Sequence, residues 1–180
     1  MVGDAKIEIE RVLQDGIDVL ADSLAGVDEE TACLRPLSDS WSIVDCVEHI
    51  ALTEAGLLTR LEKAQPAETS HADAAREARF RDLAMNRGRR IDAPELVRPA
   101  SQFTTLAQAR AAVQTARSRT LAFVRDFQGD LRSWLTQHPL ITRPVNCYEM
   151  LLLIALHPKR HAQQITEIRE QLSHARSQMK

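Results

Sequence analysis

The C-terminal part of the chain contains one long segment in which apolar residues recur at helical spacing. Residues three or four positions apart share one face of an α-helix, and those on this face are Met150, Ile154, His157, His161, Ile165, Ile168 and Leu172. Asn146 can cap the segment, and Glu149, three residues later, can bond back to the backbone N–H of the cap. The pattern predicts a long helix from Asn146 whose apolar face packs against other helices.

Two histidines, His157 and His161, lie on the inward face of this segment. Imidazoles at positions i and i+4 project from consecutive turns of a helix, so both can reach a single metal ion. Such pairs also occur on helices that bind no metal, and a structural role stays open. Burial favours a ligand, because a buried polar group without a partner costs about 1 to 3 kcal/mol. Pro158 favours a kink between them, yet we keep both histidines as predicted ligands.

Composition indicates a single all-α domain covering residues 1–180. Hydrophobic residues make up 44% of the chain, enough for one contiguous core, whereas aromatic residues make up only 4% and glycines number six. The formal net charge of -2 offers no basic surface for nucleic acid. The longest apolar run, residues 150–156, is too short to span a membrane, and the N-terminus lacks a signal-peptide pattern. We expect a cytoplasmic protein that binds neither nucleic acid nor membrane.

The three cysteines, Cys33, Cys46 and Cys147, are widely spaced and form no Cys-x-x-Cys pair. An odd number in this arrangement predicts reduced thiols rather than a disulfide framework or a thiolate zinc site. Cys46 lies one turn before His49, so its thiol could face the same space as that imidazole.

Three further segments with helical periodicity predict the other helices of a bundle. The first covers Asp4 to about Ala25, the second begins after the cap Ser42 and ends near Lys63, and the third covers residues 105–127. Residues 65–101 give a weaker signal, with a short helix and seven arginines. Acidic residues are interleaved with these arginines, so a solvated face is the simpler interpretation and a site for an anionic cosubstrate is the alternative. The segment after the third helix, punctuated by prolines, predicts a crossing loop.

His49 lies on the second helix, on a row that also contains Cys46, Thr53 and Gly56. A single histidine in such a position is more often structural than functional. Small and polar neighbours on the same row, however, leave room for a ligand or water instead of filling the interior with carbon. Metal sites in helical bundles are built from side chains on facing helices, so His49 and the pair on the final helix together suggest three ligands.

Two motifs give the chain a resemblance to a known family. The first is Trp41-Ser-Ile-Val-Asp-Cys-Val-Glu-His49, and the second runs from His138-Pro-Leu through Tyr148 to Ala155-Leu-His157-Pro-Lys-Arg-His161-Ala-Gln-Gln164-Ile. They resemble the DinB-like superfamily, and within it the YfiT-like metal-dependent proteins. The resemblance implies a four-helix bundle with long crossover loops and a short extra helix, and a homodimer. It also implies that His49, His157 and His161 hold a divalent ion, zinc or nickel.

The resemblance does not select one activity. Some members of this family transfer a low-molecular-weight thiol such as bacillithiol, mycothiol or glutathione to an electrophile, and others are described as metal-dependent hydrolases. We predict the S-transferase reaction, with hydrolysis second. A non-catalytic bundle that binds metal or a small ligand, in a stress response, is the alternative, because no general base is identifiable. Glu54 and Gln164 could orient a ligand or accept a proton, although both residue types are usually solvated on helix surfaces.

Overall fold

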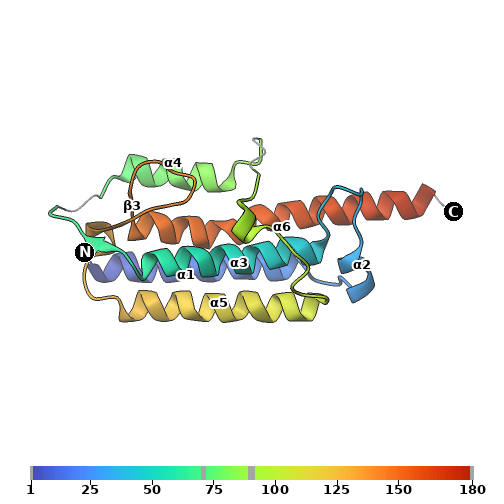
Figure 1. Ribbon diagram of the computed structural model, residues 1–180, viewed down its shortest axis with the longest axis horizontal. Helices are drawn as coiled ribbons and strands as arrows, with labels where there is room; N and C mark the ends of the chain where they lie inside the picture. Colours follow the sequence, from blue (N-terminus) through green and yellow to red (C-terminus); the bar gives the residue numbers. More distant parts are fainter. Residues whose placement is uncertain (1, 70–71, 89–91, 179–180) are drawn as a thin grey trace.

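Four long helices run side by side along the molecule (Figure 1). They are α1 (Val2–Ser23), α3 (Ile43–Leu61), α5 (Leu106–Asp126) and α6 (Cys147–Gln178). This computed structural model describes residues 2–69, 72–88 and 92–178. Helices α1 and α6 run in one direction and α3 and α5 in the other; α1 packs chiefly on α6, and α3 packs on both α5 and α6. The predicted all-α four-helix bundle is confirmed.

The helix starts follow the predicted capping residues. Ser42 and Asp45 form a reciprocal capping box at the start of α3. At α6, Asn146 Oδ1 accepts from the N–H of Glu149 at 2.8 Å, and Glu149 Oε2 accepts from the N–H of Asn146 at 3.0 Å. Both caps therefore satisfy backbone donors that a helix start would otherwise leave without partners.

Helix α6 continues through Pro158 without interruption. His157 and His161 therefore belong to one helix on either side of the proline, as the i, i+4 spacing requires. On α1, Gly16 permits a close approach to this helix, because a Cβ atom there would overlap the carbonyl oxygen of Ala155. None of the helices in the described ranges is long and apolar enough to cross a membrane.

The connections between the long helices differ in length and path. Helix α2 (Glu29–Cys33) fills the corner between α1 and α3. The connection from α3 to α5 returns along the bundle, because these helices are parallel, and it contains β1 (Gln65–Pro66), α4 (Ala74–Met85) and η1 (Glu95–Val97). The predicted loop before α6 holds η2 (Leu131–Ser133), β2 (Trp134–Thr136) and β3 (Val145–Asn146). The three strands form one small antiparallel sheet in the order β1-β2-β3.

Helix α4 is the short extra helix, and arginines attach this part of the chain to the bundle. Arg76 Nε lies 2.6 Å from a carboxylate oxygen of Glu149, and Arg81 Nη2 lies 2.8 Å from one of Glu8. Just beyond the helix, Arg87 pairs with Glu167 of α6. These three guanidiniums bind carboxylates of the bundle, and a site for an anionic cosubstrate in this segment stays a prediction. Two other arginines of this segment, Arg89 and Arg90, lie outside the described residues.

The core consists of two apolar clusters with polar side chains between them. One cluster includes Leu13, Leu58 and Met150, and the other includes Val47 and Ile168. Along α3, α5 and α6, the stretch between the clusters carries buried polar side chains, which are Glu54, Arg117, Thr120 and His161. Buried polar groups need partners or ligands, so the side chains of this layer must bind one another or another molecule.

Candidate metal centre

Three histidine rings from two helices meet between α3 and α6. The ring centroid of His49 lies 5.0 Å from that of His157 and 4.9 Å from that of His161. The two rings of α6 are 4.5 Å apart, centroid to centroid. One ligand atom from each residue can be chosen so that all three lie within 4.8 Å of one another. The structure therefore brings together the three residues that the sequence analysis predicted as ligands, while their binding of an ion stays a prediction.

Hydrogen bonds to the Nδ1 atoms fix two of the three rings. His49 Nδ1 lies 2.6 Å from the carbonyl oxygen of Val97, in η1, and His161 Nδ1 lies 2.9 Å from Oε1 of Gln164. Both partners are acceptors, so each Nδ1 carries the proton and each Nε2 keeps a lone pair. Such bonds to the other nitrogen are the usual way in which proteins orient histidine ligands.

The two histidines of α6 approach each other through their Nε2 atoms. His161 Nε2 lies 3.0 Å from Nε2 of His157. Two nitrogens that bind one tetrahedral zinc ion at about 2.0 to 2.1 Å are about 3.3 Å apart, so a small rearrangement would bring this pair to ligand spacing. Imidazole nitrogen is a donor that suits zinc and nickel. The donor set fits a divalent ion and leaves at least one coordination position for another molecule.

Burial keeps all three imidazoles neutral. Desolvation lowers the pKa of His49, although the hydrogen bond to Val97 opposes this shift. Desolvation, together with the neighbouring His161 and His49, lowers the pKa of His157 well below its usual value. Desolvation lowers the pKa of His161 to about 3, with His49 as the next contribution and Gln164 opposing. Neutral imidazoles are the form that binds metal, so the site needs no deprotonation at pH 7.

Aromatic and cationic groups surround the three rings. The Trp41 ring lies 4.9 Å from that of His49 and is stacked 6.2 Å from that of His161, centroid to centroid. Arg87 Nη1 donates to the carbonyl oxygen of Arg160 at 3.4 Å, next to His161 in the chain. The indole of Trp41 therefore packs beside the histidine rings, and the guanidinium of Arg87 lies near them.

A fourth histidine, His138, comes from the loop between β2 and β3. Its Nδ1 accepts from the N–H of Leu140 at 3.1 Å, and the ring is half-buried. Burial lowers the pKa of His138 to about 4, with Arg60 adding to the effect. His138 also contributes to the lowered pKa of His157, but it does not belong to the three-histidine cluster.

Of the three further residues considered from sequence, only Gln164 touches the cluster. Cys46 is buried in an apolar cluster and is not part of the ligand group, and burial raises the pKa of its thiol. Glu54 Oε2 accepts from Arg117 Nη2 at 2.9 Å and so serves a separate ion pair. The contact missed by sequence reasoning is Val97, because it acts through its backbone carbonyl and its side chain carries no signal of that role.

Comparison with known proteins identifies the family. The model of the DinB superfamily matches residues 13–165, a range that includes all three histidines. The chain belongs to the DinB superfamily. One relative is the uncharacterized protein YuaE of Bacillus subtilis (strain 168). It is 23% identical to this chain over 155 residues, which are 84% of this chain and 91% of YuaE.

Two solved structures share the fold of this DinB superfamily member. TT2238, described as a four-helix bundle protein, aligns with a TM-score of 0.58 at 18% identity and covers 90% of this chain and 98% of its own. YfiT from Bacillus subtilis aligns with a TM-score of 0.57 at 15% identity, covering 93% of this chain and 87% of its own. YfiT is described as a probable metal-dependent hydrolase with an unusual four-helix bundle topology. At these identities the likeness shows the fold alone.

Proposed function

We propose that this protein holds one divalent ion, zinc or nickel, between His49, His157 and His161 and acts there on a small molecule. The observation that carries the proposal is the orientation of the rings. Val97 and Gln164 engage the Nδ1 atoms of His49 and His161, which leaves their Nε2 atoms available as ligands, and His161 Nε2 lies 3.0 Å from His157 Nε2. The nitrogens of these neutral imidazoles are Lewis bases that converge on one place, and a divalent cation would accept their lone pairs.

A divalent ion bound there would supply a Lewis acid with an open position, which lowers the pKa of a thiol or a water molecule bound to it. The chain itself contributes orientation and exclusion of water. His49 and His161 are held by hydrogen bonds, and Trp41 covers both rings from one side. This arrangement suits a reaction in which a small nucleophile is held at a fixed place.

We place thiol transfer to an electrophile ahead of hydrolysis. No carboxylate joins the cluster among the described residues, and Glu54 is bound to Arg117. Activating water commonly needs a positioned base, whereas a thiol ionises more readily and is intrinsically a strong nucleophile. Hydrolysis is the second candidate reaction, supported by the description of YfiT.

A non-catalytic bundle that binds metal or a small ligand, in a stress response, is the alternative function. The same lack of a carboxylate in the cluster supports it, because a binding site needs no group that moves a proton. The enzyme and the metal-binding form of the bundle differ in turnover and not in metal content. Both can therefore be tested on one set of variants.

Metal content tests the shared part of the proposals. We would measure ions per chain by mass spectrometry in wild type, His157→Ala and His174→Ala. His174 is an exposed histidine of the same helix outside the cluster, which makes it a matched control. We expect one ion per chain in wild type and His174→Ala and none in His157→Ala. Wild type that takes up no divalent ion would contradict every metal-dependent form of the proposals and leave only a bundle that binds a small ligand without metal.

Turnover distinguishes the proposals from each other. Bacillithiol, mycothiol and glutathione would each be mixed with the electrophile monochlorobimane, and a panel of esters would be assayed in parallel. Thiol consumption that is lost in His157→Ala and kept in His174→Ala supports the transferase. Ester hydrolysis with the same dependence supports the hydrolase. One bound ion with no turnover in either assay supports the binding bundle.

A further inference from the structure

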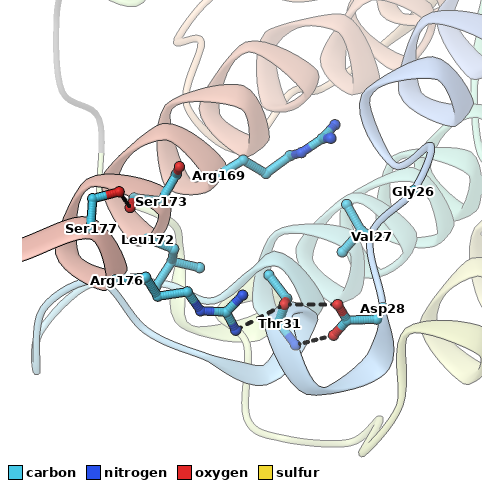
Figure 2. Close-up of a pocket in the computed structure, with 9 residues that line it drawn as sticks. All are labelled: Gly26, Val27, Asp28, Thr31, Arg169, Leu172, Ser173, Arg176 and Ser177. Atoms are coloured by element: carbon cyan, nitrogen blue, oxygen red, sulfur yellow. Dashed lines mark hydrogen bonds between the residues drawn. The ribbon is translucent and has the colours of Figure 1, made fainter. Parts of the chain in front are cut away.

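A hollow of about 380 Å³ lies near the C-terminal end of α6, away from the histidines. It opens between the last turns of α6 and the corner where α1 leads into α2 (Figure 2). Arg169, Ser173 and Arg176 line it from α6, and Asp28 and Thr31 line it from the opposite side. None of its lining residues belongs to the metal cluster. The hollow is therefore a separate site.

Two guanidiniums in this hollow form no ion pair with a carboxylate of the described residues, although the pKa of Asp28 is lowered by hydrogen bonds from Thr31 and also by Arg176 nearby. Arg169 is half-buried, and its Nη1 donates to the carbonyl oxygen of Ser23 at 2.8 Å. Arg176 Nη2 donates to Oγ1 of Thr31 at 3.2 Å. Neither forms an ion pair within the described ranges of the chain. A guanidinium carries five N–H donors, so the single neutral acceptor that each group finds leaves most of its donors without a protein partner.

The arginines elsewhere in the interior are satisfied differently. Arg117 forms an ion pair with Glu54, and Arg132 Nε lies 2.6 Å from Oε1 of Glu77. A carboxylate therefore neutralises each of these two guanidiniums. The half-buried Arg169 has only the neutral Ser23 carbonyl. Burying charge without a counter-ion is unfavourable, so an anion from solution would complete this hollow as the glutamates complete the other pairs.

The hydroxyl groups of Thr31, Ser173 and Ser177 also line the hollow, and that of Thr31 already donates to Asp28. Ser173 lies four residues after Arg169 and three before Arg176, and so shares their side of α6. The buried side chain of Leu172 forms part of the lining. Figure 2 shows Arg176 directed towards Thr31 across the hollow and Arg169 directed towards the end of α1. Charged and hydroxyl side chains thus line one hollow, with the apolar side chain of Leu172 beside them.

We propose that this hollow binds a phosphate group, either free or as part of a small phosphate monoester. Guanidinium forks match phosphate oxygens in geometry and charge. Arg169 and Arg176 carry two positive charges against the single negative charge of Asp28, which leaves a net attraction for an anion. The volume exceeds what a phosphate needs, so an organic group can lie against Leu172.

Asp28 makes the proposal testable by a gain of affinity. Its Oδ1 accepts from the N–H of Thr31 at 2.7 Å and its Oδ2 from the hydroxyl of Thr31 at 3.0 Å, and it caps α2. Asparagine caps helices about as well as aspartate, so Asp28→Asn keeps the fold while removing a charge that repels phosphate. We expect this variant to bind phosphate more tightly than wild type.

The experiment is calorimetric titration with inorganic phosphate and with phenyl phosphate at constant ionic strength. All variants carry His157→Ala as well, so that phosphate binding at a metal ion does not contribute. Arg169→Gln and Arg176→Gln should each weaken binding about tenfold or more, whereas Arg79→Gln, an exposed arginine of α4, should leave it unchanged. Tighter binding of phenyl phosphate than of phosphate would identify a monoester as the ligand, and equal binding would identify free phosphate.

Three results would overturn the proposal. They are no measurable phosphate binding, binding that neither arginine variant weakens, and acetate binding as tightly as phosphate. Arg169→Gln also removes the bond to Ser23, so its thermal unfolding must be measured alongside. Arg176→Gln changes an exposed residue near the helix end and remains informative if Arg169→Gln fails to fold. The outcome does not depend on whether the histidines bind metal.

Discussion

Helix α3 contributes a buried side chain to each of two polar clusters, and the clusters are completed in different ways. Glu54 Oε2 accepts from Arg117 Nη2 at 2.9 Å, and Arg117 Nη1 also donates to the carbonyl oxygen of Leu13 at 2.6 Å. His49, five residues before Glu54 on the same helix, instead meets two other neutral imidazoles. One cluster contains its own counter-charge, and the other contains lone pairs that face each other.

The difference separates an internally neutralised ion pair from a candidate binding site. In the ion pair, burial raises the pKa of Glu54 and lowers that of Arg117, but each partner opposes the shift of the other. In the histidine cluster, burial and neighbouring histidines act in the same direction and keep His157 and His161 neutral. The first arrangement supplies its own counter-charge, although Glu54 Oε1 and Arg117 Nε have no hydrogen-bond partner among the described residues. The second matches the donor set of a divalent cation.

Breaking the ion pair should produce the largest loss of stability. Arg117→Ala leaves Glu54 as an unpaired buried charge, which costs about 3 to 5 kcal/mol and lowers the melting temperature by about 6 to 20 °C. Metal content should stay at the wild-type value. The matched control is Arg119→Ala on the same helix, whose contact with Glu62 is exposed and is worth about 0 to 1 kcal/mol. Equal effects of the two substitutions would show that the buried pair is not structural.

Acid should destabilise the ion-free protein through the histidine cluster. His161 has a folded pKa of about 3 against an ordinary value of 6.5, so between these values the unfolded chain binds a proton that the folded protein does not. Its contribution to stability is complete above pH 6.5 and is lost as the pH falls towards 3, by about 1.4 kcal/mol per pH unit. Chemical denaturation of wild type and His161→Ala between pH 7 and 5 measures the difference. Parallel pH profiles would contradict the neutral buried state.

Removing the proposed ion should lower stability by less than breaking the buried ion pair does. At a free ion concentration 100-fold above its Kd, binding stabilises the folded state by about 2.7 kcal/mol. A chelator should therefore lower the melting temperature of wild type by about 5 to 11 °C and leave that of His157→Ala unchanged. The same shift in the variant would mean that the ion stabilises the protein at another place.

Gln164→Ala should have the smallest effect, and it should change metal affinity rather than the fold. The amide holds the His161 ring in the orientation that exposes Nε2, and loss of such a supporting group typically weakens metal affinity about 10- to 100-fold. Competition with a fluorescent zinc chelator measures the change. Gln163→Ala, one residue away and exposed, is the control. Equal affinities in the two variants would show that the contact with Gln164 does not support a ligand.

Much of the fold and the positions of the site residues could be predicted from sequence. Helical periodicity placed His157 and His161 on one face, and the capping residues Ser42 and Asn146 located the starts of two helices. Periodicity alone could not show that His49 meets the pair, because that depends on how α3 and α6 pack. The single domain, the homodimer, the cytoplasmic location and the small-molecule thiol stay predictions.

Other features depend on tertiary contacts that have no local sequence pattern. Glu54 was a candidate for the site, but its partner Arg117 lies 63 residues away in the chain, and nothing near either residue indicates the pairing. The backbone carbonyl of Val97 reaches His49 across 48 residues. The strands β2 and β3 are too short for periodicity to distinguish them from a loop.

The most direct test of a shared ion is anomalous X-ray diffraction at the zinc or nickel absorption edge from crystals grown with that metal. We predict one anomalous peak about 2.0 to 2.2 Å from Nε2 of His49, His157 and His161, present above the edge and absent below it. A metal-saturated crystal whose only peak lies elsewhere, or is bound by fewer than these three nitrogens, would contradict the account.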